Sequence, residues 1–439
     1  FYGTLWLTNK RQENDSLVIV NGILIDGTTC SGEVTIPDGV TNIGNSAFFG
    51  CSGLTNISIP KSVTSIGDFA FFGCTGLTSV TIPKSVTSVG DKAFSGCNKL
   101  TEVLLENGST LTSENLGVDE SIIGTYWNED NLTWTLTADG TLTISGTGAM
   151  KDYDTDYSPA AQKKDSVKKV VIQEGITSIG NNAFGNCTGL TDIKIPERVT
   201  SIGNDAFYNC TGLTDVEIPE SVASIGNSAF SWCSSLTSIT IPKSVTSIGD
   251  GAFFDCRKLA SIEIPEGVTS IGNYAFYNCS NLASITIPSS VTSIGEWAFY
   301  NCTGLTSITI PKNVTSIGSN VFDGCTDLTK VLLEGGSTLT YTDLGVDENK
   351  VVTRWNEDNL TWTLDAEGTM TISGTGAMKD YGTENLSPAA SKSSSVNRIV
   401  IQEGVTIIGS SAFDSCSNLA SIEIPEGVTN IGAFAFYNC

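Results

Sequence analysis

Cysteine is the residue type in this sequence whose chemistry and regular spacing first suggest a site. Twelve of the 13 cysteines hold one place in a repeated motif, and those from Cys187 to Cys325 recur every 23 residues. If consecutive motifs stack as neighbouring strands do, these thiols lie about 5 Å apart, within disulfide range. Stacked parallel side chains point the same way, however, and no Cys-x-x-Cys pair typical of a zinc site is present. We therefore expect buried free thiols that act as small apolar residues.

An acidic run is the second candidate for chemistry. Asp152, Asp154 and Asp156 have the alternate spacing of a calcium-binding loop. The glycine and the distant glutamate of an EF-hand loop are missing, and a later copy of this segment keeps only Asp380 of the three aspartates. We expect a solvated loop here, and no metal or other cofactor.

Composition excludes several classes of function. Histidine, the commonest general base and metal ligand, is absent, and the other carboxylates recur with the repeat without a unique nucleophile beside them. We therefore expect no enzymatic activity. The net charge of −24 argues against nucleic acids and anionic membrane surfaces as partners. No apolar run is long enough for a transmembrane helix, so we expect no direct membrane insertion of this stretch.

The motif that positions these residues is illustrated by Leu236–Cys256. Its first residues, LTSITI, alternate apolar and polar side chains as a half-buried strand does, and Pro242 ends that strand. Gly249 permits a turn, and the spacing of Ala252, Phe253 and Cys256 predicts one short helical turn that faces inward. A unit this short cannot bury its apolar face alone, so the units must stack into a solenoid.

Two nearly identical segments break the period. Trp127–Tyr153 and Trp355–Tyr381 each alternate threonine with apolar residues around a central turn, which predicts a β-hairpin. Ser158-Pro159 predicts the start of a short helix, and Asn21-Gly22 predicts a hairpin near the beginning of the chain. The predicted parts are an N-terminal cap with a β-hairpin (1–35), a first repeat array (36–106), a spacer with a β-hairpin (107–166), a second array (167–334), a second copy of the spacer (335–395) and the start of a truncated third array (396–439).

The repeated residues I-P-x-x-V-T-S-I-G-x-x-A-F-x-x-C-x-x-L-T-S-I resemble the BspA-like leucine-rich repeats of bacterial surface proteins. The resemblance implies an α/β solenoid rich in β-structure, with 23-residue units and a parallel sheet, one strand per repeat, interrupted by the hairpin spacers. It also implies export to the cell surface or secretion. Some members of that family are adhesins that bind host matrix proteins or other bacteria. The resemblance carries no ligand-contact motif over to this sequence.

Two surfaces of the second array are candidate binding sites. One is the outward-facing row of hydroxyl and carboxylate side chains on the strands. It forms a flat hydrogen-bonding surface that suits a protein partner, or it consists of strand residues that simply face water. Its members are Asp215, Glu217, Ser238, Thr240, Ser261, Glu263, Ser284, Thr286, Ser307 and Thr309. The other is an aromatic patch that suits either sugar rings or a protein, or that simply covers the convex side. Its members are Phe254, Tyr274, Tyr277, Trp297 and Tyr300.

These patterns predict an extracellular binding protein. The first hypothesis is an adhesin that recognises a host or microbial surface or matrix protein on the strand face. The second is a carbohydrate-binding module that uses the aromatic patch, and the third is a structural stalk without a ligand of its own. We expect a monomer, and a longer protein of which this sequence is a fragment.

Overall fold

The computed structural model describes residues 4–13 and 17–439. Contacts within the chain divide it into two units, and both contain the 23-residue repeat. Unit 1 comprises Phe1–Met150, Gln162–Thr177 and Asp192–Pro196, and unit 2 comprises Lys151–Ala161, Ser178–Thr191 and Glu197–Cys439. The short helix α3 (Pro159–Gln162) lies where the sequence passes between them.

Unit 1 contains two sheets in which most neighbouring strands are parallel, whereas β1 pairs antiparallel with β2, and β11 pairs antiparallel with β10 and β12. One sheet has the order β16-β14-β12-β11-β10-β9-β7-β5-β3, and a second has the order β1-β2-β4-β6-β8. The elements are α1 (Leu5–Glu13), β1 (Val18–Val20), β2 (Ile23–Asp26), β3 (Gly32–Thr35), β4 (Asn42–Ile43), β5 (Leu54–Ser58), β6 (Ser65–Ile66), β7 (Ser79–Ile82), β8 (Ser88–Val89), β9 (Glu102–Glu106), α2 (Ser113–Leu116), η1 (Glu120–Ile122), β10 (Ile123–Glu129), β11 (Leu132–Leu136), β12 (Thr141–Gly146), β13 (Gly148–Ala149), β14 (Lys169–Ile172), β15 (Ile176–Ser178) and β16 (Asp192–Lys194).

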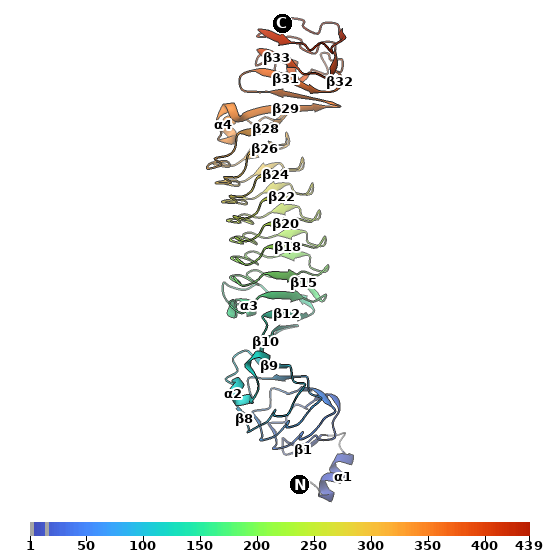
Figure 1. Ribbon diagram of the computed structural model, residues 1–439, viewed down its shortest axis with the longest axis vertical. Helices are drawn as coiled ribbons and strands as arrows, with labels where there is room; N and C mark the ends of the chain where they lie inside the picture. Colours follow the sequence, from blue (N-terminus) through green and yellow to red (C-terminus); the bar gives the residue numbers. More distant parts are fainter. Residues whose placement is uncertain (1–3, 14–16) are drawn as a thin grey trace. The chain divides into compact units, whose positions relative to one another are not determined.

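Unit 2 continues the same pattern, with longer strands on one side of each turn of the chain and two-residue strands on the other (Figure 1). Its elements are β17 (Ser201–Ile202), β18 (Asp215–Glu217), β19 (Ser224–Ile225), β20 (Ser238–Thr240), β21 (Ser247–Ile248), β22 (Ser261–Glu263), β23 (Ser270–Ile271), β24 (Ser284–Thr286), β25 (Ser293–Ile294), β26 (Ser307–Ile310), β27 (Ser316–Ile317), β28 (Lys330–Glu334), α4 (Tyr341–Leu344), η2 (Glu348–Lys350), β29 (Val351–Glu357), β30 (Leu360–Leu364), β31 (Thr369–Gly374), β32 (Gly376–Ala377), α5 (Pro388–Ser391), β33 (Arg398–Ile401), β34 (Val405–Ile408), β35 (Ser421–Glu423) and β36 (Asn430–Ile431).

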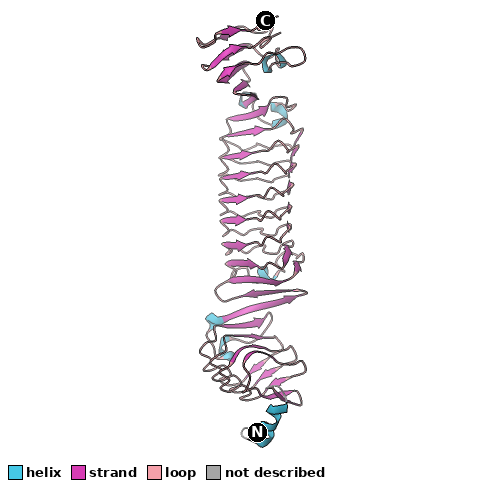
Figure 2. Ribbon diagram, turned by 90° about the vertical axis from the view of Figure 1, so that its right-hand side faces the viewer, coloured by secondary structure: helices cyan, strands magenta, loops and turns pink. Residues whose placement is uncertain are grey.

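Each repeat of the second array carries two strands, not the single strand that the sequence predicted. The predicted strand is present as β20, whose residues pair in register with those of β18. The additional strand, β21, pairs in parallel with β19 through Ile225 and Ile248 (Figure 2). The parallel leucine-rich-repeat solenoid itself is confirmed. The extra strand escaped prediction because two residues are too short to show an alternating pattern.

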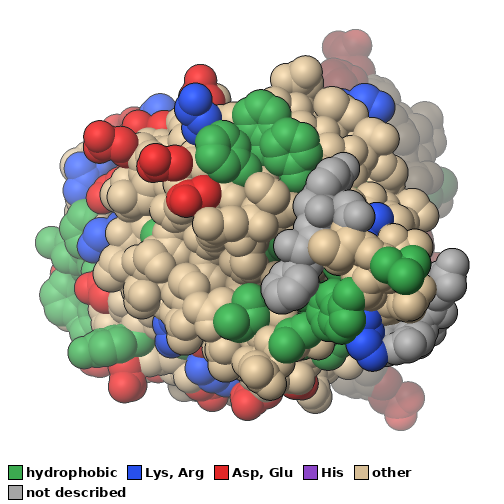
Figure 3. Space-filling view, turned by 90° about the horizontal axis from the view of Figure 1, so that it is seen from below, with side chains coloured by type: hydrophobic (Ala, Val, Ile, Leu, Met, Phe, Trp, Pro, Cys, Tyr) green, Lys and Arg blue, Asp and Glu red, His purple; other side chains and the backbone are tan. Residues whose placement is uncertain are grey.

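The surface is polar and mixed in charge. On the face shown in Figure 3, acidic and basic side chains are interspersed, and hydrophobic side chains form small separate groups. None of the described helices has the length and apolar character needed to cross a bilayer.

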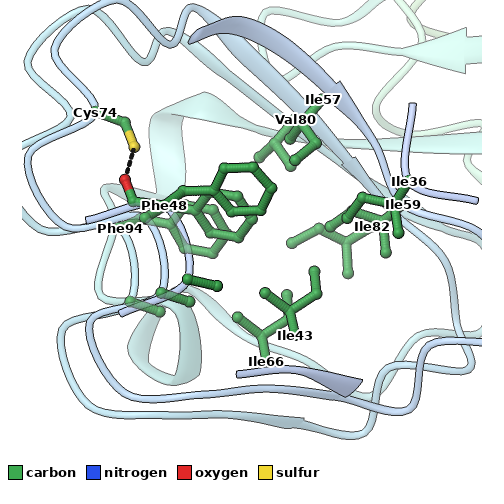
Figure 4. Packing of buried hydrophobic residues seen from close by; sticks show 14 of the residues in the cluster. Ile36, Ile43, Phe48, Ile57, Ile59, Ile66, Cys74, Val80, Ile82 and Phe94 are labelled. Atoms are coloured by element: carbon green, nitrogen blue, oxygen red, sulfur yellow. Dashed lines mark hydrogen bonds between the residues drawn. The ribbon is translucent and has the colours of Figure 1, made fainter. Parts of the chain in front are cut away.

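The interior is a set of columns in which the same side chain recurs from repeat to repeat. In unit 1, Phe48, Phe71 and Phe94 stack with ring centroids 5.0 and 5.1 Å apart, beside columns of isoleucine and valine (Figure 4). The thiol of Cys74 donates a hydrogen bond to the carbonyl oxygen of Phe48 over 3.1 Å. Stacking identical apolar residues covers each repeat with its neighbours, which is how a solenoid obtains a continuous core.

The turn that carries Ala252, Phe253 and Cys256 is not helical, contrary to the prediction. It is a chain of tight turns in which Gly251 and Asp255 have φ values of 61° and 60°. A helical turn and this arrangement both place residues three apart on the same side, so sequence spacing could not separate them.

Gly249 has a different role from the predicted one. Its φ is not positive, and a Cβ atom added there would lie 2.8 Å from the backbone nitrogen of Asn227 in the preceding repeat. Glycine is therefore required at this position because two repeats approach closely, not because the backbone turns there.

The spacers continue the sheet. In unit 2, β28 pairs in parallel with β29, β29 and β31 both pair antiparallel with β30, and β31 pairs in parallel with β33. The predicted hairpin is present as β30–β31 in this copy and as β11–β12 in unit 1, and a further strand precedes each. One nine-stranded sheet therefore passes through the second spacer without a flexible break.

The remaining local predictions are confirmed. The backbone of Asn21 and Gly22 is left-handed, with φ values of 49° and 76°, and joins β1 to β2 as a hairpin. The hydroxyl oxygen of Ser158 accepts a hydrogen bond from the backbone nitrogen of Ala161 over 3.0 Å, as an N-cap residue does at the start of α3.

Candidate functional site

The strand face of unit 2 presents two outward positions in each repeat. In β20 the side chains of Ser238 and Thr240 are exposed, and Ile239 between them is buried. The same alternation occurs in β18, β22 and β24. The exposed members of this row that were predicted from sequence are Asp215, Glu217, Ser238, Thr240, Ser261, Glu263, Ser284, Thr286 and Ser307, and Thr309 is half-buried.

A groove of about 730 Å³ lies over the middle of this row. Of the predicted residues it brings together Thr240, Glu263 and Thr286, which come from three successive strands. The other predicted residues lie outside the groove, on these three strands and on β18 and β26. The full lining is Glu220, Ile239, Thr240, Ile241, Lys243, Glu263, Ile264, Pro265, Glu266, Gly267, Thr286 and Pro288.

One wall of the groove, beside the strand row, comes from residues that directly follow the Ile-Pro pairs. These residues were not predicted from the sequence. Glu220, Lys243 and Glu266 occupy this place in successive repeats. The backbone nitrogen of Lys243 donates to Oε2 of Glu220 over 3.2 Å, and the hydroxyl of Ser289 donates to Oε2 of Glu266 over 3.3 Å. The available signal was the polar or charged residue that recurs after each proline.

The aromatic patch is a second constellation in the same unit. The rings of Phe254 and Tyr277 stack with centroids 4.6 Å apart, and those of Tyr277 and Tyr300 with centroids 4.7 Å apart. Tyr274 and Trp297 form a looser second row, with centroids 6.4 Å apart. Because the rings of the first row face one another, most of their faces are unavailable to a ligand. The geometry thus supports the interpretation that the middle of the patch simply covers the convex side of the array.

Trp232 extends this patch and was not predicted as part of it. Its ring lies 5.9 Å from that of Phe254, and it is 39 % exposed. Trp232, Tyr274 and Trp297 have φ values of 63°, 56° and 58°, a region that bulky side chains rarely adopt. The signal for Trp232 was its place next to the repeated cysteine, where other repeats have glycine, asparagine, aspartate or serine.

Polar ladders hold neighbouring repeats in register at a place that the sequence did not suggest. The Oδ1 atom of Asn204 accepts from the backbone nitrogen of Asn227 over 2.8 Å, and Asn227 accepts in the same way from Asp250 over 2.9 Å. The acidic run begins this ladder, because Oδ1 of Asp152 accepts from the backbone nitrogen of Asn181 over 2.8 Å. Asp152 is therefore a structural residue at the end of the repeat array. The described residues contain no cluster that could hold a metal ion.

The cysteines from Cys187 to Cys325 form a buried column, as predicted. The thiol of Cys233 donates to the carbonyl oxygen of Phe207 over 3.2 Å, and the thiol of Cys256 donates to that of Phe230 over 3.1 Å. Burial raises the pKa of Cys233 to about 12 and holds the pKa of Cys256 well above its ordinary value. Thiols in this state are poor nucleophiles, so the column stabilises the core and supplies no catalytic group.

Comparisons with known proteins agree with this fold. A family model described as the BspA type leucine-rich repeat region, in six copies, matches residues 27–117, 158–281, 246–344 and 384–439, more than half of the chain. A comparison with curated proteins found no match.

Three solved structures are similar to the chain. A leucine-rich repeat protein from Bacteroides ovatus is 24 % identical, with a TM-score of 0.42 and coverage of 93 % of this chain and 84 % of that one. A leucine rich cell surface protein from Faecalibacterium prausnitzii is 25 % identical, with a TM-score of 0.34 and coverage of 79 % and 94 %. A leucine-rich repeat protein from Eubacterium ventriosum is 27 % identical, with a TM-score of 0.32 and coverage of 71 % and 93 %. On the match of its repeats to the family model, the chain belongs to the BspA-type leucine-rich-repeat family.

Proposed function

We propose that this chain is a non-enzymatic binding protein of the bacterial cell surface, an adhesin that holds a host or microbial protein on the strand face of unit 2. Membership of the BspA-type family supports the surface location. The observation that carries the proposal is the groove over Thr240, Glu263 and Thr286.

The shape and chemistry of this groove suit an extended segment of a protein partner. Its floor is the strand row, with hydroxyl and carboxylate groups that can pair with a partner's polar backbone. Pro265 and Pro288 add apolar area along one side. A groove built from repeats has a regular spacing of contacts, as solenoid binding surfaces do.

Charge favours a partner with basic side chains. Glu220, Glu263 and Glu266 line the groove beside a single lysine, Lys243, and the whole chain has a net charge of −24. Complementary charge speeds association and is screened by salt. We expect the affinity to fall as ionic strength rises.

The test is binding of the full chain to a panel of matrix proteins and mucins at physiological salt. Replacing both Thr240 and Thr286 by Lys places two long cations in the groove, and we expect the affinity to fall at least about tenfold. The matched control replaces Thr246 and Thr292, exposed threonines of the same repeats outside the groove, by Lys. Equal binding by both double variants would exclude this face.

A structural stalk is the alternative that one observation favours. The sheet of unit 2 runs through the second spacer from β28 to β33 without interruption, which would make this part of the chain stiff. A folded, monodisperse chain that binds nothing in the panel would favour the stalk over the adhesin.

A further inference from the structure

The groove over the strand face alternates in charge from repeat to repeat. The residues that follow three successive Ile-Pro pairs, Glu220, Lys243 and Glu266, all line it. All three residues are exposed to solvent. The order of charge along this wall of the groove is therefore negative, positive, negative.

The two carboxylates of this wall lie two repeats apart. The short strands β19, β21 and β23, each of which follows one of the three charged residues in the chain, pair in succession through Ile225, Ile248 and Ile271. Paired strands lie about 4.8 Å apart. Glu220 and Glu266 are thus separated by about 9.6 Å along the groove.

Hydrogen bonds hold both carboxylates in place. Oε2 of Glu220 accepts from the backbone nitrogen of Lys243 over 3.2 Å, and Oε2 of Glu266 accepts from the hydroxyl of Ser289 over 3.3 Å. Each of these bonds uses one oxygen of the carboxylate, so Oε1 can accept from a ligand. The two acidic groups are therefore positioned before a ligand binds.

The groove is long and narrow. Its lining comes from four successive repeats, from Glu220 to Pro288, which span about 14 Å. A volume of about 730 Å³ over this length gives a mean cross-section of about 50 Å². An α-helix with its side chains is about 10–12 Å across and needs about twice that area. The groove therefore suits a single extended chain.

The spacing of the carboxylates distinguishes between extended conformations. In a β-strand, side chains on one face recur about every 6.8 Å, which does not match the distance between Glu220 and Glu266. In a polyproline II helix, side chains on one face recur at every third residue, about every 9.3 Å. This repeat agrees with the separation of about 9.6 Å between the two carboxylates.

We propose that this groove binds a polyproline II segment of a protein partner with an arginine or lysine at every third residue. The inference rests on the proposed function and adds the conformation and the sequence period of the partner. Two cations of the segment pair with Glu220 and Glu266, and Glu263 adds negative charge in the same repeat as Glu266. Lys243 repels a cation placed between them, so closer spacings are disfavoured.

The probes are two peptides of twelve residues, acetylated and amidated, titrated into the full chain by calorimetry. The first consists of four copies of Pro-Pro-Arg. The second is Pro-Pro, then four copies of Arg-Pro, then Pro-Pro, so it has the same composition and charge but no two arginines three residues apart. Both favour the polyproline II conformation. We expect the first peptide to bind at least about tenfold more tightly than the second.

Two double variants make the test specific. Glu220→Gln with Glu266→Gln keeps the shape of both side chains, and it should lose the preference for the first peptide. The matched control is Glu348→Gln with Glu367→Gln, which changes the net charge equally at two exposed glutamates outside the groove and should keep the preference. The proposal is overturned if neither peptide binds, if both bind equally, or if the variant of Glu220 and Glu266 keeps the preference.

Failure of this inference can be distinguished from failure of the proposed function. A panel protein whose binding is lost when Thr240 and Thr286 are replaced by Lys, without a preference between the two peptides, would overturn only the conformation and period of the partner. A folded chain that binds no panel protein and neither peptide would overturn both proposals.

Discussion

Two columns of aromatic rings run through unit 2, one inside the solenoid and one on its surface. The inner column comprises Phe184, Phe207, Phe230, Phe253, Phe276, Phe299 and Phe322, stacked at 5.2 to 5.8 Å. The outer column comprises Trp232, Phe254, Tyr277 and Tyr300, and it stops at both ends within the array. The inner column must be complete because any missing ring leaves a cavity. The outer column can vary, so it is free to carry specificity.

Two adjacent residues should show the largest difference in stability between the inner and the outer column. Phe253 of the inner column is fully buried, and Phe254 of the outer column is half-buried. We expect Phe253→Ala to lower the free energy of unfolding by about 3–5 kcal/mol. Phe254→Ala should lower it by about 1 kcal/mol, because only surface stacking is lost. Chemical denaturation measures both values, and equal losses would contradict the distinction between the columns.

The thiols beside the inner column allow a pH test of whether the core excludes water. The pKa of Cys233 is about 12 in the folded chain, against an ordinary value of 9.0. The folded state therefore keeps this proton after the unfolded state has lost it. The resulting stability is fully present below pH 9 and is lost as the pH rises towards 12.

We expect Cys233 to contribute at most about 1.4 kcal/mol of lost stability for each pH unit in this range. Denaturation of the wild type and of Cys233→Ala between pH 8 and 10.5 isolates this contribution. Parallel curves for the two proteins would show that water reaches the thiol in the folded state.

A smaller change in the free energy of unfolding distinguishes the cost of a left-handed backbone from the stabilisation by ring stacking. Lys92 and Tyr274 both have a positive φ, at 55° and 56°, and only Tyr274 stacks on other rings. Lys92→Gly should raise the free energy of unfolding by about 1 kcal/mol. Tyr274→Gly should gain less, since the lost ring contacts offset the relief. An equal gain at both positions would mean that the second aromatic row adds no stability.

The sequence was sufficient for the parts of this fold that repeat with a simple period. Alternation placed Thr240 and Thr286 correctly on the exposed side of their strands, and the repeat length predicted the stacking. The groove above them depends also on Lys243 and Glu266, which the strand pattern does not include.

Other features could not be predicted from the sequence, because different backbone conformations give the same spacing of apolar residues. Ala252, Phe253 and Cys256 fit a helical turn and a series of tight turns equally well, and only the latter places Tyr274 and Trp297 at a positive φ. The role of Asp152 depends on a hydrogen bond to Asn181, a residue 29 positions away. Contacts between repeats of this kind leave no local pattern in the sequence.

Hydrogen exchange of the chain bound to a protein ligand is the decisive measurement for the proposed adhesive surface. If the strand face is the binding surface, amides in Thr240–Lys243 and Glu263–Gly267 should exchange more slowly in the complex than in the free chain. Those in Tyr274–Asn278 and Trp297–Asn301, on the turn that carries the aromatic columns, should be unchanged. Slower exchange confined to the aromatic turn would contradict the proposed adhesive surface and would assign the protein partner to the outer column.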